Sequence, residues 1–113
     1  MHELSIVMSI VDIAIEEVRK HHARTVDSIE LEIGTMAGVA FDSLEFAWEV
    51  GVRNTILQES EKKIERVQAR ARCAECGSEY AVTEPYAPCP VCNNFLVEYL
   101  SGKELRVKSL VVS

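Results

Sequence analysis

Hydrophobic residues recur at intervals of three and four over residues 4–22, and this period predicts a helix. The apolar stripe contains Leu4, Val7, Val11, Ala14, Ile15 and Val18, and it is widened by Ile6, Ile10 and Ile13. Because the stripe is wide, we expect the helix to pack on a sheet with little of its surface exposed. His21 and His22 follow as solvated side chains at the helix end, where cationic groups are favoured.

Residues 29–33 alternate between apolar and acidic side chains, a period of two that predicts a half-buried strand. Gly34 closes the strand, and residues 35–40 form an irregular loop. Asp42 with Glu45 three positions later is a capping-box pattern, so we expect Asp42 to begin a second helix. Trp48 lies on the apolar side of that helix and is expected in the core.

A second extended segment covers residues 62–72, where Val67, Ala69 and Ala71 alternate with polar residues. Ile64 is out of phase with this alternation, which indicates a bulge or register shift near Arg66. Residues 95–100 form a short predicted strand, a turn follows at 101–103, and residues 105–112 form a final strand rich in β-branched side chains.

Four cysteines lie between the second and third of these strands as two CxxC pairs twelve residues apart: Cys73, Cys76, Cys89 and Cys92. Each pair can direct two thiolates at one point, so the two pairs together predict a closed tetrahedral zinc site. A redox function for one CxxC pair requires a thioredoxin-like βαβ context, which the pattern lacks. Two structural disulfides require a secreted protein, and no signal peptide is evident.

The order of these elements predicts an α+β fold in which two helices pack on a three-stranded sheet with an inserted zinc-ribbon module. We expect one α/β domain at residues 1–72 plus 101–113 and a zinc-ribbon domain at 73–100. The last strand must then pair with strands that precede the module. Exchange of that strand between protomers makes a homodimer possible.

The 113-residue chain is 48% hydrophobic, enough for one modest core and a small metal-stabilised module. No apolar stretch reaches the length of a membrane span, so we expect a cytoplasmic protein with reduced thiols and no membrane partner. The net charge is −6, and residues 74–98 contain four glutamates but no Lys or Arg. Because nucleic acid binding requires cations, nucleic acid is not an expected partner.

The first three residues carry a second candidate metal site. Met1 is expected to be retained, because the residue after it is a large histidine. Its α-amine, the His2 imidazole and the backbone amides of His2 and Glu3 offer four nitrogens that can lie in one plane, an arrangement that selects Ni(II) or Cu(II) over zinc. The first amides of a helix have no intrahelical acceptor, so their use breaks no helical hydrogen bond. His21 and His22 lie about 30 Å further along the helix and cannot contribute.

Four segments together resemble the HypA family of nickel metallochaperones for nickel–iron hydrogenase maturation. They are Met1-His2-Glu3-Leu4-Ser5, the Gly34 loop followed by residues 44–49, the paired CxxC module, and Gly102-Lys103-Glu104-Leu105. The CxxC pairs indicate zinc only, whereas the first and last segments are specific for the family. The resemblance spans essentially the whole chain.

The resemblance implies that His2 and nearby backbone nitrogens anchor nickel, with Glu3 in the same motif, while the four cysteines hold structural zinc. It implies two partners: a nickel-binding GTPase of the same pathway and the hydrogenase large subunit precursor. In some members, urease maturation proteins are partners too. Delivery of nickel is binding and hand-over, so the chain is not expected to be an enzyme.

One departure concerns histidine. Some relatives carry histidines beside the CxxC pairs, linked to a zinc site that changes ligands with pH, but this chain has none after His22. We therefore hypothesise that its zinc remains bound by four thiolates at mildly acidic pH. The alternative function is a zinc-ribbon adaptor for protein interactions without a second metal.

Overall fold

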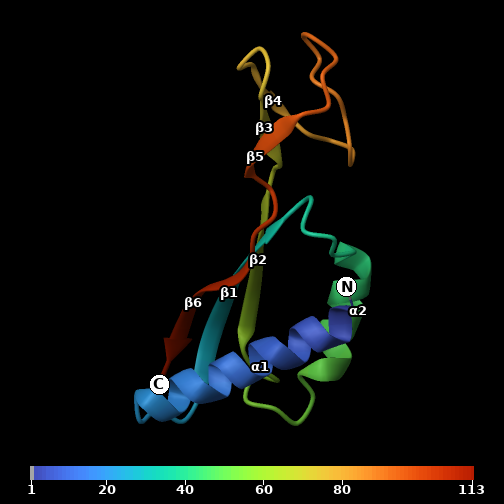
Figure 1. Cartoon of the computed structure of the whole chain (residues 1–113). Helices are drawn as coiled ribbons and strands as arrows, with labels where there is room; N and C mark the ends of the chain where they lie inside the picture. The colour runs from blue at the N-terminus through green and yellow to red at the C-terminus, as the bar shows by residue number, and fades with distance from the viewer. Residues whose placement is uncertain (1) are drawn as a thin grey trace. The chain divides into compact units, whose positions relative to one another are not determined.

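The structure is a computed structural model that describes residues 2–113. Its elements are α1 (Glu3–Lys20), β1 (Val26–Gly34), α2 (Phe41–Gly51), β2 (Glu61–Val67), β3 (Arg70–Cys73), β4 (Glu79–Ala81), β5 (Val97–Ser101) and β6 (Leu105–Val112). The strands form two three-stranded sheets, with the orders β2-β1-β6 and β4-β3-β5 (Figure 1). The two helices and the first sheet agree with the α+β prediction, and the second sheet lies around the cysteines.

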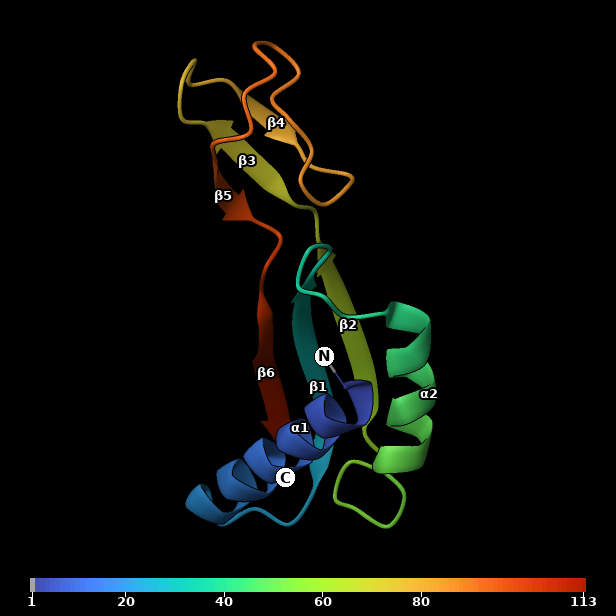
Figure 2. The same cartoon turned by 45° about the vertical axis from the view of Figure 1, so that its right-hand side comes forward.

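β1 is the central strand of the first sheet. Its two ends lie near the corresponding ends of β2, since Ser60 Oγ donates to the Val26 carbonyl and the Thr35 N–H donates to the Val67 carbonyl. These two strands therefore run in parallel and require a crossover, which α2 provides. β6 runs the opposite way on the other side of β1, which confirms that the last strand returns to strands before the cysteines (Figure 2).

α1 lies across one face of this sheet and packs against α2 (Figures 1 and 2). Its buried side chains are Ile6, Val7, Ile10, Val11, Ala14 and Val18. Ile13 and Ile15 are 45% and 44% exposed, so the expectation that little of this helix is exposed was wrong. A straight helix can press only one stripe against a sheet, and its flanking apolar positions stay at the rim.

The beginning of α2 differs from the prediction that Asp42 is its N-cap. The helix begins at Phe41 with Ala40 as its N-cap, and no side chain caps it. Asp42, the predicted cap, lies in the first turn instead, where its negative charge favours the positive end of the helix dipole. The N–H of Ala40 itself donates to Glu3 Oε2 on α1 at 3.5 Å. Trp48 is buried, as predicted.

The face of the sheet away from the helices carries charged side chains in register across the strands. Ile29, Leu31 and Ile33 point into the core, so the alternate residue Glu30 faces solvent. Lys108 Nζ on β6 lies 3.9 Å from Glu30 Oε1 and 2.7 Å from Glu65 Oε2 on β2. Hydrogen bonding to Lys108 lowers the pKa of Glu65 below its ordinary value.

The predicted extended segment 62–72 is two strands rather than one, because β2 ends at Val67 and β3 begins at Arg70 in the other sheet. Ala69 lies at this break, where three pieces of backbone meet. A Cβ on Gly34 would lie 2.0 Å from the Gly102 carbonyl carbon, and one on Gly102 would lie 2.3 Å from Ala69 Cβ. Only residues without a side chain permit Gly34 and Gly102 to approach so closely.

The chain divides into two compact units. The helix unit contains residues up to Leu31, Val39–Glu65 and Arg106–Ser113, and the cysteine unit contains Glu32–Gly38 and Arg66–Leu105. The cysteine unit has a small core of Ala69, Ala71 and Val82, against which Met36, Tyr80, Val97 and Tyr99 pack. The glycine contact of Gly34 with Gly102 lies within this unit.

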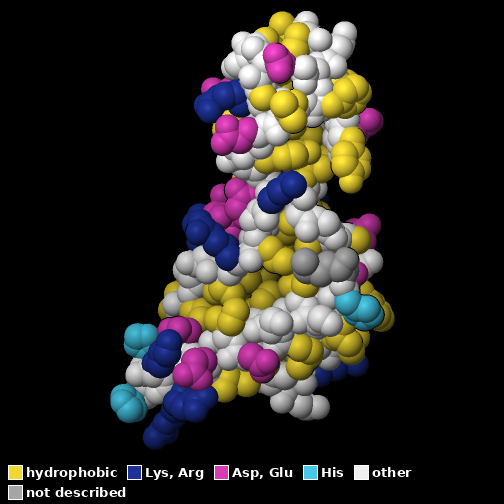
Figure 3. Space-filling view, in the orientation of Figure 1, with side chains coloured by type: hydrophobic (Ala, Val, Ile, Leu, Met, Phe, Trp, Pro, Cys, Tyr) yellow, Lys and Arg dark blue, Asp and Glu magenta, His cyan; other side chains and the backbone are white. Residues whose placement is uncertain are grey.

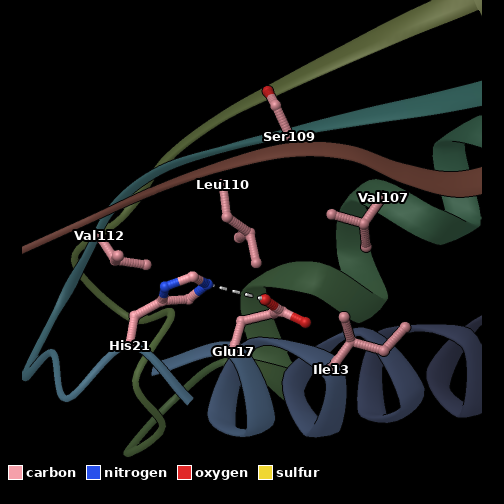
Figure 4. A pocket seen from close by; sticks show the side chains of 7 residues that line it. All are labelled: Ile13, Glu17, His21, Val107, Ser109, Leu110 and Val112. Atoms are coloured by element: carbon pink, nitrogen blue, oxygen red, sulfur yellow. Dashed lines mark ion pairs between the residues drawn. The ribbon is translucent and has the colours of Figure 1, made fainter. Parts of the chain in front are cut away.

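In the helix unit, a hollow of about 400 Å³ lies between the C-terminal half of α1 and β6 (Figures 3 and 4). Its apolar lining comes from Ile13, Val107, Leu110 and Val112. At its end, His21 Nε2 lies 3.5 Å from a Glu17 carboxylate oxygen. His21 and His22 are exposed at the end of α1, as the sequence predicted.

Candidate metal centre

The first CxxC pair is a tight knuckle at the end of β3. The Cys73 N–H donates to the Ser78 carbonyl at 2.9 Å, and the Gly77 N–H donates back to the Cys73 carbonyl at 3.0 Å. Gly77 has φ +76°, a left-handed conformation that glycine adopts without a steric cost. The turn reverses the chain within six residues and brings Cys73 and Cys76 to the same side of it.

The second pair repeats this pattern. The Cys89 N–H donates to the Asn94 carbonyl at 2.9 Å, and the Asn93 N–H donates back to the Cys89 carbonyl at 2.8 Å. Asn93 has φ +61° and occupies the position that Gly77 holds in the first knuckle. Asparagine tolerates the left-handed region better than most residues. The two CxxC pairs are therefore two copies of one backbone motif.

The two knuckles direct all four sulfurs to one point. Their Sγ atoms lie within 4.8 Å of one another, with 3.4 Å between Cys73 and Cys92 and 3.6 Å between Cys76 and Cys89. All four cysteines are unbridged. Four ligands 2.3 Å from a tetrahedral metal ion are separated by about 3.8 Å, so the donor set fits a four-thiolate metal centre. The structure thus brings together the four cysteines that the sequence selected.

The thiols differ in acidity. Hydrogen bonds from the Ser78 hydroxyl and backbone N–H lower the pKa of Cys76 to about 6, and Sγ of Cys76 lies 3.3 Å from Ser78 Oγ. The Asn94 backbone lowers the pKa of Cys92, but hydrogen bonding with Cys73 and burial raise it to about 12. A cluster of thiols cannot ionise together unless a cation compensates the charge, so binding of a divalent metal releases protons.

The sheet β4-β3-β5 supports the first knuckle. β3 pairs antiparallel with β4 through Ala71 opposite Tyr80, and antiparallel with β5 through Cys73 opposite Val97. The Tyr80 hydroxyl is buried and has no hydrogen-bond partner among residues 2–113. Burial and the neighbouring cysteines raise its pKa, so the hydroxyl keeps its proton beside the sulfur cluster.

The second predicted site begins with Met1, which lies outside the described residues. His2 is exposed and is the N-cap of α1, with φ −83° and ψ 113° and no capping bond from its side chain. Glu3 is the first helical residue, and its carboxylate faces the Ala40 N–H. The side chain of Glu3 therefore serves the beginning of α2.

Within residues 2–113 the cysteines are the one group of three or more His, Cys, Asp or Glu side chains close enough to share a metal ion. His2 belongs to no such group. A site built mainly of backbone nitrogens, as predicted for the first three residues, would not produce a side-chain cluster of this kind.

Two contacts of these sites were missed by sequence reasoning. Ser78 lies two residues after the first CxxC pair, and its proximity could have indicated a hydrogen bond to a sulfur. The contact between Glu3 and Ala40 joins segments 37 positions apart. No local pattern signals it.

Together, the fold and the sulfur cluster define a small α+β protein with four cysteines placed to hold one metal ion. Among residues 2–113, no helix has the length and apolar character needed to cross a membrane. The chain belongs to the HypA family: residues 1–112 match the family model described as hydrogenase/urease nickel incorporation, metallochaperone.

Curated relatives agree over nearly their full length. The hydrogenase maturation factor HypA of Geotalea uraniireducens is 46% identical over 112 residues, which cover 99% of each chain. The HypA of Chlorobaculum tepidum is 38% identical with the same coverage. The solution structure of the nickel metallochaperone HypA from Helicobacter pylori has a TM-score of 0.69 at 22% identity and covers 99% of this chain and 97% of that one. At this identity the solved structure supports the fold.

Proposed function

We propose that this chain is a nickel metallochaperone that binds Ni²⁺ at its first three residues and delivers it for maturation of a nickel–iron hydrogenase. The nickel ligands are the α-amine of Met1, the backbone amide and imidazole of His2, and the backbone amide of Glu3. A zinc ion bound by the four cysteines has a structural role. The family match over residues 1–112, combined with an exposed His2 at the start of α1, carries the proposal.

The local geometry at His2 supports a site made mainly of backbone nitrogens. Its extended φ and ψ precede a helix whose first N–H groups have no intrahelical acceptor. The imidazole is exposed and has no hydrogen-bond partner among residues 2–113. Because the imidazole of His2 is the one side-chain ligand of the proposed site, the metal stays accessible, and ligands of a partner protein can replace those that bind it. That property suits transfer rather than storage.

The chemistry of the sulfur cluster supports zinc. Thiolates favour zinc over magnesium, calcium and manganese, and a closed set of four leaves no position for a substrate. Cys73 and Cys89 are buried, whereas Cys76 and Cys92 are at the surface. The zinc ion would link the two knuckles within a unit whose buried cluster is small, Ala69, Ala71 and Val82.

The proposed partners are the nickel-binding GTPase of hydrogenase maturation and the hydrogenase large subunit precursor. The charges around the cysteines do not suit nucleic acid. Arg72, the nearest cation in sequence, already lies 3.5 Å from Glu79 and 3.9 Å from Glu98. The function proposed is binding and transfer, without a catalysed reaction, in the cytoplasm. A homodimer formed by exchange of β6 is compatible with the proposal.

The test is a Ni²⁺ titration of untagged, zinc-loaded protein at neutral pH, followed by calorimetry. We expect about one nickel per chain. A variant with one glycine before Met1 and the variant His2→Ala should each lose at least tenfold in affinity with unchanged circular dichroism. The control His22→Ala replaces an exposed histidine at the other end of α1 and should bind as the parent does.

Equal binding by all variants would place nickel elsewhere in the chain and overturn the proposal. Absence of nickel binding from the untagged protein would also overturn it, and would favour a zinc-ribbon adaptor.

A further inference from the structure

We propose that an exposed apolar hollow between the start of α1 and α2 is a docking site for a cationic, amphipathic segment of a partner protein. This docking hollow has a volume of about 260 Å³. It is lined by His2, Glu3, Leu4, Ser43, Phe46, Ala47 and Val50. The hollow belongs entirely to the helix unit.

The apolar side chains of the hollow are unusually exposed. Phe46 is 70% exposed, and Leu4 and Val50 are 40% and 43% exposed. A scattered surface hydrophobic residue is ordinary, but three that line one concavity mark an interaction site. Phe46 offers the aromatic anchor that interface centres favour.

The sequence of α2 explains how this surface arises. Leu44, Ala47 and Trp48 form the buried stripe of the helix. Ser43, Phe46 and Val50 follow positions i, i+3 and i+7 and form a second stripe beside it, which the core does not need. A partner helix can place its apolar face in a groove lined by residues at this spacing.

The two helices that form the docking hollow pack closely against each other. A Cβ on Gly51 would lie 2.7 Å from Val7 Cγ1 and 3.3 Å from Leu4 Cδ1, so α1 and α2 are in close contact at the end of the hollow. Ala47 at its floor is buried. A preformed surface loses little conformational entropy on binding, which favours association.

The helix segments that form the hollow are acidic, and Glu3 is the charged residue in its lining, which favours a cationic partner. α2 contains Asp42, Glu45 and Glu49 but no Lys or Arg. The charged residues within positions 3–12 of α1 are likewise acidic, Glu3 and Asp12. Glu45 is neutralised by Lys62, whose Nζ lies 2.5 Å from its carboxylate. Asp42 and Glu49 have no ion-pair partner among residues 2–113. A segment with an apolar side chain between lysines or arginines complements this surface.

Other occupants match less well. An anionic membrane surface and a nucleic acid would both be repelled by the acidic side chains of these two helix segments. A second copy of the chain carries a net charge of −6 and would also be repelled overall. The complementary occupant is therefore a cationic protein segment.

His2 lies on the wall of the hollow. A docked segment would therefore reach the imidazole with its own metal ligands, which makes this surface suited to transfer of nickel. This last step rests on the proposed function, whereas the docking itself does not.

The experiment uses full-length, zinc-loaded protein and a designed 14-residue amphipathic peptide of leucine and lysine. Binding is measured by calorimetry and by shifts of backbone amide signals at two salt concentrations. Three companion peptides have glutamate in place of lysine, serine in place of leucine, or a scrambled order. The test variant is Phe46→Ser, and the matched control is Phe95→Ser, since Phe95 is 71% exposed in the cysteine unit.

We expect the leucine–lysine peptide to shift amides of residues 43–50 and of α1's first turn. Phe46→Ser should weaken binding at least tenfold, and Phe95→Ser should leave it unchanged. Asp42→Lys with Glu49→Lys should also weaken binding and reduce its dependence on salt, whereas Glu75→Lys, a charge change in the other unit, should not.

Equal affinity for the leucine–glutamate peptide, or unchanged binding by Phe46→Ser, overturns the proposal. It is also overturned if Phe46→Ser abolishes self-association or binding to anionic vesicles while the peptide does not bind. A nickel titration of the parent protein, run beside its peptide titration, separates the two proposals. Retained peptide binding with no nickel at the first three residues would reject the metallochaperone function and keep the docking site.

Discussion

The backbone of Gly34 lies directly against the backbone of Gly102. A Cβ at position 34 would be 2.0 Å from both the carbonyl carbon and the carbonyl oxygen of Gly102. Hydrogen bonds hold the crossing, from the Met36 N–H to the Gly102 carbonyl at 2.7 Å and from the Gly34 N–H to the Glu104 carbonyl at 2.8 Å. This contact gives a structural reason for two of the segments that carry the family resemblance.

Replacing Gly34 with alanine should destabilise the protein by about 3 kcal/mol, because the clashing atoms belong to backbone and cannot rotate away. Thermal or urea unfolding measures the loss. The matched control is Gly38→Ala, where no atom lies within 4 Å but φ is +81°. It should cost about 1 kcal/mol from backbone strain alone. Equal effects of the two substitutions would contradict the close contact.

Substitutions at Glu3 distinguish the role of its backbone amide from the role of its carboxylate. Glu3→Pro removes the N–H proposed as a nickel ligand, yet proline is favoured at the first helical position, and the extended φ and ψ of His2 suit a residue before proline. We expect nickel affinity to fall at least tenfold while the helix persists by circular dichroism.

Glu3→Gln should have the opposite result. It keeps the amide and removes a negative charge beside the beginning of α2, so stability should fall by about 0.5 kcal/mol while nickel affinity changes less than threefold. A large loss of nickel affinity in Glu3→Gln would show that the carboxylate is a metal ligand.

Removal of zinc should unfold the cysteine unit. A structural zinc site contributes about 10 kcal/mol or more to folding, whereas the unit's own buried cluster holds only Ala69, Ala71 and Val82. Both chelation and Cys92→Ser should collapse the amide signals of residues 70–101. Val91→Ser, an exposed change between two cysteines, is the control and should keep zinc. Dispersed signals after complete zinc removal would contradict a structural role.

The zinc ligands should be sulfur only at both pH 7.5 and pH 6. No histidine follows His22 in the sequence, so an imidazole of the cysteine unit cannot replace a thiolate as protons compete. X-ray absorption at the zinc edge reports the ligand atoms directly. Nitrogen ligands at pH 6 would refute this prediction.

The ion pair between Lys108 and Glu65 should make the free energy of unfolding decrease at acidic pH. The folded-state pKa of Glu65 is lowered, first by the Lys108 hydrogen bond, from an ordinary value of 4.5. Its contribution is therefore fully present above pH 4.5 and is lost as pH falls through the lowered pKa. In Lys108→Ala, NMR titration of the Glu65 carboxyl should give a higher pKa. Lys103→Ala, which removes a cation near Tyr99, should leave it unchanged.

Much of the fold could be predicted because its signals are local. The period of α1, the alternation of β1 and β6, and the spacing of the cysteines are each contained in one short stretch. The phase of Ile64 predicted a bulge or register shift near Arg66. It did not predict that the chain leaves one sheet after Val67 and enters the other at Arg70. Whether an extended segment continues in one sheet or passes to another depends on partners far away in sequence.

The errors have similar causes. β4 contains only Glu79–Ala81, too short to show an alternating pattern. Asp42 had the residue type of a cap, but α2 begins one residue earlier, at Phe41, and the N–H of its N-cap Ala40 donates to Glu3 on another helix. The docking hollow was also missed, because Phe46 and Val50 are surface positions only by virtue of how α1 packs on α2.

The position of β6 has a consequence for synthesis of the protein. β6 lies beside β1, yet all four cysteines separate the two strands in the sequence. The ribosome therefore completes both sulfur knuckles before it makes the strand that finishes the helix-covered sheet. A cell short of zinc would release chains whose last strand must find its place across an unfolded insertion. With the proposed zinc site, the supply of zinc would govern how readily the chain completes its helix-covered sheet.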